Sequence, residues 1–509
     1  MERSHMGPAG CYNSLESDRT GDDIMQLNDA SLLKTQSFVD GKWIDTDSGE
    51  TFAVTNPATG EVVAEVAKCG GKETRRAIEA AEKAQIEWRQ KTATERSVLM
   101  RRWFDLMMEH QEDLARILTA EQGKPLAEAR GEIAYGASYL EWFAEEAKRL
   151  YGDVIQPPAT DRRIVVIKQP VGVVACITPW NFPNAMLARK VGAALAAGCT
   201  TVCKPATATP LSAFAMAELA ERAGIPAGVI NILAGHTGAI GDELTSNPTV
   251  RKLTFTGSTE VGKQLVAQCA RTMKRTSMEL GGNAPFIVFD DADLDNAVKG
   301  TLASKYRNAG QTCVCANRIL AQDTVMEEYS KKLAAAVSEF KLGDGTDEGV
   351  TMGPLIDDAA ADNVCSMIED AVAKGAEVVL GGGRSKLGGS FVEPTILSGV
   401  TSDMRVFREE IFGPVSPLVS FGSEEEAVAL ANDTEFGLAA YFCARDVGRI
   451  WRVAEGLEYG IIGINEGVIS NAMAPFGGIK ESGNGREGSK YGLDDYVEIK
   501  YLCIGGIDT

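Results

Sequence analysis

Histidine is scarce in this sequence. Only three occur among 509 residues, at His5, His110 and His236. Metal sites built from several histidines are therefore excluded by number, and we expect no metal site. A serine–histidine or cysteine–histidine mechanism likewise has little to draw on. We interpret His110, in an expected helix over 97–119, and His236, in the stretch AGHTGAIG, as structural or surface residues.

Basic side chains are fewer than acidic ones. Lys and Arg number 51 against 71 Asp and Glu, which gives a formal net charge of −20. Such a field repels nucleic acid and anionic membrane surfaces, so we expect neither as a partner. No apolar run approaches the ~20 residues that a helix needs to cross a bilayer.

Signals for export and for a disulfide scaffold are missing as well. Residues 1–30 are polar and partly acidic, unlike a secretory signal or an arginine-rich transit peptide. We predict a disordered or tag-bearing extension there. The eleven cysteines are scattered through a long chain, which suits reduced thiols, and we therefore expect a cytoplasmic protein.

What is present is an alternation of strands and helices. Residues 72–150 have helical periodicity, and 151–170 change to a Pro-Pro turn followed by a β-rich run. From 171, short buried strands alternate with helices, and a second such series begins at PFIVFDD. This rhythm predicts an α/β fold with two doubly wound, mainly parallel sheets and a small β appendage.

Three motifs lie where such folds bind ligands. For each of them a purely structural role is the alternative to a functional one. FTGSTEVGK (255–263) can present backbone N–H groups to a pyrophosphate, or can be an ordinary strand-to-helix turn. Lys204 ends a predicted strand and is either a ligand-binding or a solvated residue. Glu279, beside a Gly-Gly pair, suits a general base or a cap equally well. The GxGxxG and Walker patterns are absent, so a nucleotide site must be built differently.

The segment RNAGQTCVCANR (307–318) holds two cysteines, Cys313 and Cys315, separated by one valine. A metal clip, inert packing, a disulfide and a nucleophile all produce this pattern. No other CxC or CxxC exists to complete a metal site, and the polar, glycine-containing loop favours exposure. A nucleophilic thiol needs a base, and with so few histidines Glu279 is the candidate.

Seven motifs, in order, resemble the signatures of the aldehyde dehydrogenase superfamily: TPWNFP, KPA, FTGSTEVG, MELGGNAP, GQTC, EEIFGPV and PFGGIKESGNGRE. The resemblance covers about residues 35–505, and its closest branch is the succinate-semialdehyde dehydrogenases. It implies a dinucleotide-binding domain over 31–150 and 171–281, a catalytic domain over 282–478, and an oligomerisation arm from 151–170 and 479–509. A homodimer or homotetramer follows from the arm.

The resemblance also implies roles for individual residues. Cys313 would attack an aldehyde, Asn181 would hold the oxyanion, and Glu279 would activate water against the resulting thioester. The implied cofactor-binding residues are Ile177, Trp180, Lys204, Thr207, Gly257, Ser258, Glu410 and Phe412.

Substrate and cofactor choice turn on a few positions. The resemblance assigns Arg189, Arg307 and Ser470 to the distal carboxylate of succinate semialdehyde, and a longer semialdehyde such as that of glutarate is the alternative. Thr207 stands where many NAD-preferring members carry glutamate, so we expect NADP to be preferred, with NAD possible. Reversible oxidation at Cys315 is a further hypothesis, because members of this branch switch activity off through such a pair.

Overall fold

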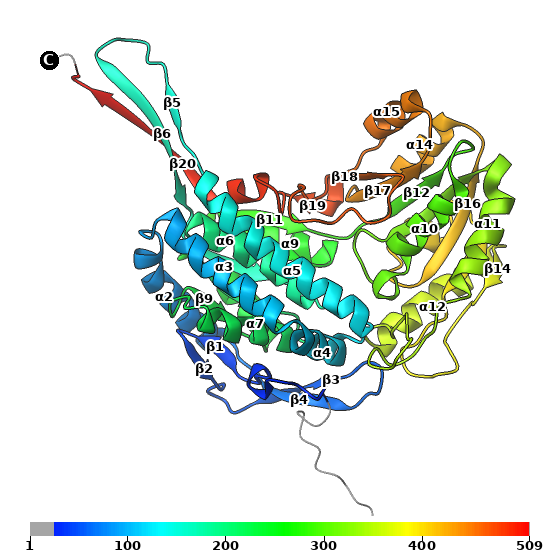
Figure 1. Ribbon diagram of the computed structural model, residues 1–509, viewed down its shortest axis with the longest axis horizontal. Coiled ribbons are helices and arrows are strands. Elements are labelled where there is room, and N and C mark those ends of the chain that lie inside the picture. Colours follow the sequence, from blue (N-terminus) through cyan, green and yellow to red (C-terminus); the bar gives the residue numbers. More distant parts are fainter. Residues whose placement is uncertain (1–24, 508–509) are drawn as a thin grey trace, which may run out of the picture.

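The computed structural model describes residues 25–507, and most of the expected extension 1–30 lies outside them. An eight-stranded sheet forms the centre of the first half (Figure 1). Its strand order is β19-β11-β10-β7-β8-β9-β1-β2, and β7 to β11 run parallel. The bounds are β1 (Ser37–Val39), β2 (Lys42–Ile44), β7 (Val173–Ile177), β8 (Thr200–Lys204), β9 (Ile230–Ile232), β10 (Val250–Thr256), β11 (Arg275–Glu279) and β19 (Gly483–Asn484).

Helices cover both faces of this sheet. They are α2 (Gly71–Trp88), α3 (Ala93–Glu109), α4 (Gln111–Gln122), α5 (Leu126–Glu146), α6 (Pro183–Ala197), α7 (Leu211–Arg222), α8 (Thr237–Ser246) and α9 (Thr259–Cys269). The prediction of a single helix over 97–119 is wrong, because the chain forms the two helices α3 and α4 there. His110 leaves helical geometry (φ −99°, ψ 20°), so the chain changes direction there and begins α4.

A seven-stranded sheet forms the second half, in the order β14-β15-β16-β13-β12-β17-β18. All neighbours are parallel except β14 and β15. The strands are β12 (Ala284–Val288), β13 (Ala316–Gln322), β14 (Glu377–Leu380), β15 (Thr395–Ser398), β16 (Val415–Phe421), β17 (Ala439–Cys443) and β18 (Ile461–Ile464). The two doubly wound sheets confirm the predicted fold class.

The helices of the second half are α10 (Leu294–Lys305), α11 (Asp323–Val337), α12 (Asp358–Ala373), α13 (Arg405–Arg408), α14 (Glu424–Asn432) and α15 (Val447–Gly456). The helix α10 ends at Lys305, shortly before the loop that carries Cys313. Asn308 and Ala309 take positive φ angles of 53°, which no right-handed helix accommodates. Short 3₁₀ turns complete the chain: η1 (Ala30–Leu32), η2 (Ala147–Arg149), η3 (Ala270–Thr272), η4 (Arg307–Gly310), η5 (Lys480–Ser482) and η6 (Tyr491–Tyr496).

A three-stranded antiparallel sheet projects from the first half (Figure 1). It consists of β5 (Asp153–Ile155), β6 (Arg162–Pro170) and β20 (Val497–Gly505). Of the segment 479–509 expected in the arm, the sheet takes only 497–505. The preceding residues lie elsewhere, since β19 pairs with β11. A separate hairpin joins β3 (Thr51–Thr55) and β4 (Val62–Ala67).

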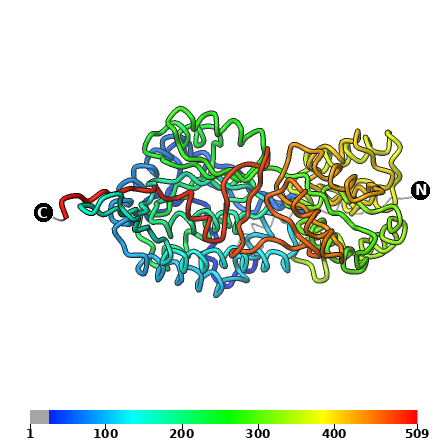
Figure 2. The backbone as a smooth tube through the Cα atoms, turned by 90° about the horizontal axis from the view of Figure 1, so that it is seen from above, coloured from blue at the N-terminus to red at the C-terminus, as the bar shows by residue number. Residues whose placement is uncertain are grey.

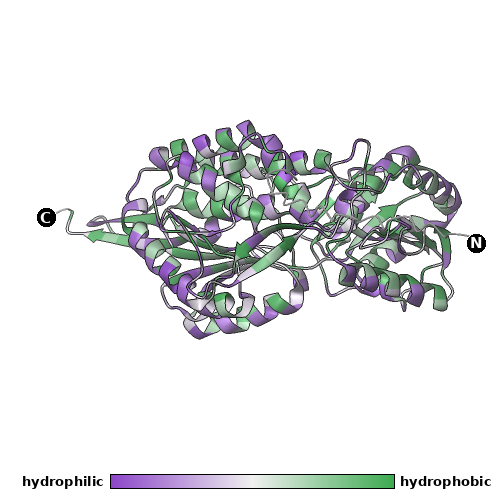
Figure 3. Ribbon diagram, turned by 90° about the horizontal axis from the view of Figure 1, so that it is seen from below, coloured by the Kyte–Doolittle hydropathy of each residue, from purple (hydrophilic) through white to green (hydrophobic). Residues whose placement is uncertain are grey.

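The two halves have separate hydrophobic cores and meet along one boundary (Figure 2). Their strands are mostly apolar, and the polar residues gather on the outer faces of the helices (Figure 3). Within residues 25–507, no helix is both long and apolar enough to cross a membrane.

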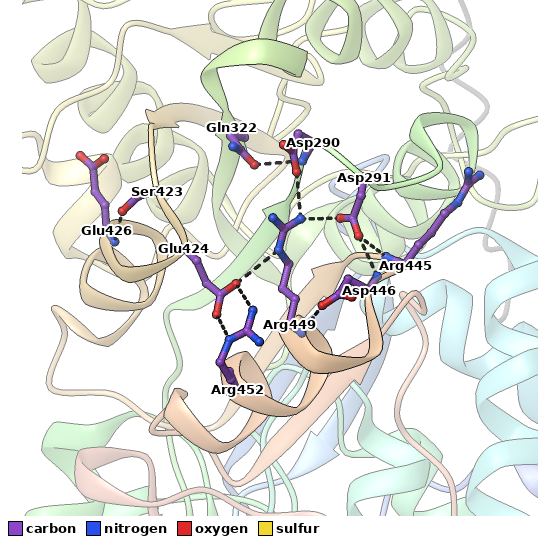
Figure 4. Close-up of polar contacts among 10 residues, drawn as sticks. All are labelled: Asp290, Asp291, Gln322, Ser423, Glu424, Glu426, Arg445, Asp446, Arg449 and Arg452. Carbon is purple, nitrogen blue, oxygen red and sulfur yellow. Dashed lines mark hydrogen bonds and ion pairs between the residues drawn. The ribbon is translucent and has the colours of Figure 1, made fainter.

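An ion-pair network ties the N-termini of α14 and α15 to the end of β12 (Figure 4). The guanidinium of Arg449 contacts Asp290 at 2.8 Å and Asp291 at 2.7 Å, and Glu424 pairs with both Arg449 and Arg452. The network lies at the outer end of the second sheet, and none of its residues lines the main cavity.

Candidate active site

Four neighbouring strands of the first sheet end at the same edge. In the order β11, β10, β7 and β8, their carboxyl ends bring Glu279, Gly257, Ile177 and Lys204 to that edge. Ligands of doubly wound sheets bind outside such carboxyl ends. The second sheet turns its amino edge to the same region, because Gly282, Cys313 and Glu410 precede β12, β13 and β16.

A cavity of about 260 Å³ lies between the two edges. It brings together ten of the residues predicted from the sequence: Trp180, Asn181, Arg189, Gly257, Ser258, Arg307, Cys313, Glu410, Phe412 and Ser470. Five other predicted residues do not line it: Ile177, Lys204, Thr207, Glu279 and Cys315. Of these five, Lys204, Glu279 and Cys315 are buried.

The loop that carries Cys313 is held in an unusual backbone conformation. Asn308 and Ala309 have positive φ, and the N–H of Cys315 closes a turn on the carbonyl of Thr312 at 2.9 Å. Non-glycine residues in the left-handed region cost free energy and concentrate at functional sites. The turn directs Cys313 into the cavity, whereas the thiol of Cys315 points inward and donates to the carbonyl of Lys305 at 2.9 Å.

The Gly-Gly pair after Glu279 has a steric reason. A Cβ on Gly282 would lie 2.4 Å from the carbonyl oxygen of Cys313, and one on Gly281 would lie 2.8 Å from Oε2 of Glu410. At position 282 only glycine permits the approach, because the atom it meets is a backbone oxygen, whereas the Glu410 carboxylate beside Gly281 ends a flexible side chain. The pair therefore lets the nucleophile loop and the Glu410 segment close on the end of β11.

Asn181 is positioned as a donor beside the thiol. Its side-chain Nδ2 donates to the carbonyl of Gln311 at 2.9 Å, which leaves its second amide hydrogen free. Its backbone carbonyl accepts from Lys124 at 2.7 Å and from Asn308 at 3.0 Å. A fixed amide donor next to a nucleophile is what stabilises a tetrahedral oxyanion.

The thiol of Cys313 requires activation. Burial raises its pKa to about 12, an effect that the guanidinium of Arg189 offsets only in part. The neighbouring carboxylate of Glu279 is 1% exposed, and neither of its oxygens accepts a hydrogen bond from the described residues. Burial, followed by the like charge of Glu487, raises the pKa of Glu279 well above its usual value, against Arg189, Lys190 and Arg486. A carboxyl group with a raised pKa holds its proton more readily than an ordinary glutamate, which is typical of groups that act as acids and bases in catalysis.

Several groups fit a dinucleotide. Lys204 is 4% exposed, and burial lowers its pKa to about 8. Within residues 25–507 its Nζ donates only to the carbonyl of Pro205, at 3.2 Å. Ser258 occupies the N-cap of α9, yet its side chain makes no capping hydrogen bond. Both groups therefore retain donors for ribose and phosphate oxygens.

Four further residues belong to the part of the site that fits a dinucleotide: Thr207, Glu410, Trp180 and Phe412. Thr207 is exposed and lies 3.5 Å from Oγ1 of Thr237, at the start of α8. Glu410 accepts from the N–H of Gly282 at 3.1 Å, and burial raises its pKa to about 7. Trp180 and Phe412 pack edge to face, with ring centroids 5.6 Å apart.

The two predicted carboxylate-binding arginines differ in their environment. Arg189 is 1% exposed, forms an ion pair with Glu487, and lies 4.4 Å from the ring of Phe476. Arg307 is half-buried, and its guanidinium lies 5.4 Å from the ring of Phe182. Across residues 25–507 this guanidinium has no hydrogen bond or ion pair. Arg307 is therefore the cation more readily available to a ligand.

Sequence reasoning did not identify Glu487, Phe182 and Phe476 as parts of the site. All three stand inside quoted motifs, in TPWNFP and PFGGIKESGNGRE. Their position inside a motif could therefore have indicated that they belong to the site. Their contacts with Arg189 and Arg307, however, depend on the tertiary fold. Tyr135 and Met186, which also line the cavity, carry no comparable signal.

Comparison with known proteins identifies the family of this chain. The family model described as "Aldehyde dehydrogenase family" matches residues 43–502. A glutarate-semialdehyde dehydrogenase of Pseudomonas aeruginosa is 64% identical, over 95% of this chain and 100% of the relative. The NADP⁺ succinate-semialdehyde dehydrogenase of Escherichia coli is 62% identical, over 94% and 100%. A crystal structure described as an E. coli NADP-dependent enzyme superimposes with a TM-score of 0.94 at 62% identity, covering 94% of this chain and 100% of that one. The chain belongs to the aldehyde dehydrogenase family.

Proposed function

We propose that the protein oxidises succinate semialdehyde to succinate, with NADP as the preferred hydride acceptor. The observation that carries this proposal is that Arg307, Arg189 and the thiol of Cys313 line one cavity of about 260 Å³. Guanidinium groups bind carboxylates through paired charge-assisted hydrogen bonds. A substrate with an aldehyde at one end and a carboxylate at the other satisfies both parts of the cavity.

The protein residues act in a defined order. Cys313 adds to the aldehyde carbon, and the thiohemiacetal oxyanion accepts from the side-chain amide of Asn181 and the N–H of Cys313. When bound, the nicotinamide supplies the hydride acceptor. Glu279 then removes a proton from water that attacks the thioester on Cys313, and succinate leaves.

The cofactor would lie across the carboxyl edge of the first sheet. Lys204 and Glu410 would bind its two riboses, Gly257 and Ser258 its pyrophosphate, with Phe412, Trp180 and Ile177 around the nicotinamide side. Thr207 supports the preference for NADP, because an uncharged hydroxyl in place of a glutamate does not repel a 2′-phosphate. The E. coli relative that is named for NADP⁺ is consistent with this choice.

Glutarate semialdehyde is the second candidate substrate, and a relative at 64% identity is named for it. One methylene group changes transition-state binding by only ~1–3 kcal/mol in an apolar pocket. We therefore expect overlapping activity on both semialdehydes, with Ser470 assisting the arginines at the distal carboxylate.

The test is NADPH and NADH formation with succinate semialdehyde, glutarate semialdehyde and butanal, with Cys313→Ala as the blank. We expect kcat/KM to be highest for the carboxylated aldehydes. We expect it to be about tenfold higher with NADP than with NAD, since a hydrogen bond from the hydroxyl of Thr207 to a charged 2′-phosphate would contribute about 1.4 kcal/mol. If kcat/KM for butanal equals that for the carboxylated aldehydes, the proposed substrate is rejected. A preference for NAD would reject the proposed cofactor.

Cys315 is proposed as a redox partner of Cys313. Both thiols are free, and the tight turn from Thr312 to Cys315 holds them on one loop. A peroxide would oxidise the two thiols to a disulfide and be reduced in turn, with loss of the nucleophile. We expect Cys315→Ala to abolish the part of peroxide inactivation that dithiothreitol reverses. Unchanged reversible inactivation in this variant would reject the switch.

We also infer a homo-oligomer, a dimer or a tetramer, in the cytoplasm. The projecting sheet exposes large apolar side chains, with Val154 83% and Ile499 71% exposed. A second copy that covers this sheet would remove them from water. Light scattering that gives the mass of one chain would contradict the oligomer.

A further inference from the structure

A buried lysine contacts the segment that carries Asn181. Lys124 lies in the short connection between α4 and α5, and it is 2% exposed. Its ammonium donates to the backbone carbonyl of Asn181 at 2.7 Å and to Oε2 of Glu132 at 2.5 Å. It also lies 3.8 Å from the ring centroid of Phe182, the next residue along the chain. One buried cation therefore holds two successive residues that line the cavity.

Glu132 connects this lysine to the start of α6. Its Oε1 accepts from the N–H of Asn184 at 3.0 Å and from the N–H of Ala185 at 3.3 Å. These N–H groups belong to the first turn of α6, where no carbonyl of the helix itself can accept from them. Lys124 and Glu132 thus fix the chain on both sides of Phe182.

The carbonyl of Asn181 is also held from the nucleophile loop. It accepts a second hydrogen bond from Nδ2 of Asn308 at 3.0 Å, and Asn308 is part of the left-handed turn before Cys313. Gln122 donates to Oδ1 of Asn308 at 2.9 Å, and the N–H of Asn308 donates to Oε2 of Glu128 at 2.8 Å. The end of α4 and the start of α5 therefore support the Asn181 segment and the nucleophile loop together.

Stability alone is a weak reason for such a lysine. A buried ion pair is often no more stabilising than apolar side chains of the same size. Precision of the site is a stronger reason, because an oxyanion donor has to lie about 2.7–3.1 Å from the developing charge. A displacement of about 1 Å at a reacting group can cost 10²-fold in rate. The carbonyl that Lys124 holds belongs to the residue whose side-chain amide is the proposed oxyanion donor.

We propose that Lys124 is a positioning residue for the oxyanion site, which acts through the backbone carbonyl of Asn181 to fix the Asn181 amide beside the thiol of Cys313. The inference rests on the proposed function, in which that amide binds the thiohemiacetal oxygen. Lys124 does not line the cavity. Its loss should therefore slow the step in which the oxyanion forms, rather than weaken binding of the aldehyde.

The test is Lys124→Met, which keeps a long apolar side chain and removes the ammonium. With saturating NADP and succinate semialdehyde, the rapid phase of NADPH formation should slow at least about tenfold, because the oxyanion donor is misplaced. The KM should change less than about threefold, since no group that binds the substrate is lost. Rapid-mixing absorbance at 340 nm and steady-state kinetics give the two values.

Alkylation of Cys313 by iodoacetamide separates positioning from general damage to the site. This displacement forms a C–S bond and releases iodide, and no oxyanion arises in it. Its rate at Cys313, followed by mass spectrometry, should change less than about threefold in Lys124→Met. An unchanged rapid phase of NADPH formation, or an equal loss in both reactions, would overturn the proposal.

A double substitution tests the route through Asn181. If Lys124 acts only through Asn181, Lys124→Met combined with Asn181→Ala should be as slow as Asn181→Ala alone, within about twofold. Independent contributions would instead multiply the two losses, and that result would also overturn the proposal.

Two further variants control for stability. Lys274→Met removes another buried lysine, which donates to the carbonyls of Asn247 at 2.6 Å and Val250 at 2.8 Å, at the amino end of β10 and away from the site. Its rapid phase should keep the wild-type rate. Lys124→Met leaves the carboxylate of Glu132 buried without its cation, which destabilises the fold. Adding Glu132→Gln removes that charge, and the same slow rapid phase and unchanged alkylation are expected.

Failure of the proposed function has a different signature. If Asn181→Ala by itself leaves the rapid phase unchanged, Asn181 is not the oxyanion donor. Failure of the present inference alone would leave Asn181→Ala slow and Lys124→Met as fast as the wild type.

Discussion

Glu279→Gln should stop the enzyme after one turnover. Glutamine keeps the size of the side chain but cannot remove a proton from water, so the thioester on Cys313 accumulates. We expect a burst of one NADPH per active site, followed by turnover reduced about 10³-fold, the scale of a lost general base. Stopped-flow absorbance at 340 nm measures both phases.

Two controls separate this result from a folding defect. Adding hydroxylamine, an external nucleophile that cleaves thioesters, should restore steady turnover in Glu279→Gln. Cys313→Ala should give no burst at all. Loss of the burst itself in Glu279→Gln would mean that Glu279 serves the attack of Cys313 rather than the hydrolysis.

Arg307→Ala should raise the KM for succinate semialdehyde about 100-fold, which corresponds to ~3 kcal/mol for a charge-assisted hydrogen-bond pair. Arg307 is chosen over Arg189 because it lines the cavity and, in the described part of the chain, no carboxylate competes for it. The KM for butanal should change less than threefold, because that substrate has no distal charge. Steady-state kinetics at saturating NADP provide both values.

A matched variant controls for the loss of one positive charge. Arg445→Ala removes the same type of side chain from the surface, where Arg445 is well exposed and pairs with Asp293 at 3.2 Å. Its KM for succinate semialdehyde should stay at the wild-type value. Equal increases for butanal and succinate semialdehyde in Arg307→Ala would exclude Arg307 as the carboxylate-binding residue.

The order of strands and helices was predictable from local pattern. The short apolar runs that end at Ile177 and Lys204 are buried strands of a parallel sheet, as their composition indicates. The predicted helix bounds were wrong where the backbone departs from the conformation that its local sequence favours. Neither the break at His110 nor the left-handed Asn308 is encoded by periodicity, since both arise from how the adjoining segments pack.

The candidate residues were also predictable, and their roles remain predictions. Motif order placed Cys313, Asn181 and Arg307 in one family site, and the structure brings them to one cavity. It separates Lys204 and Thr207 from that cavity, on the part of the sheet edge proposed for the cofactor. The steric requirement for the Gly-Gly pair could not be predicted from the sequence. It arises from the close approach of Gly282 to Cys313, a residue on another loop.

The sequence by itself predicted the fold class, the candidate nucleophile Cys313 and, through the family resemblance, Arg189 and Arg307 as candidates for binding a carboxylate. Each depends on residue identity and short-range pattern, which a chain carries before it folds. Only the tertiary structure decided that Arg189 is paired with Glu487, that the guanidinium of Arg307 has no ion pair within residues 25–507, and that the charge of Glu487 acts on the buried Glu279. Coulomb energies depend on distance and burial, and for residues far apart in the sequence both are set by packing alone.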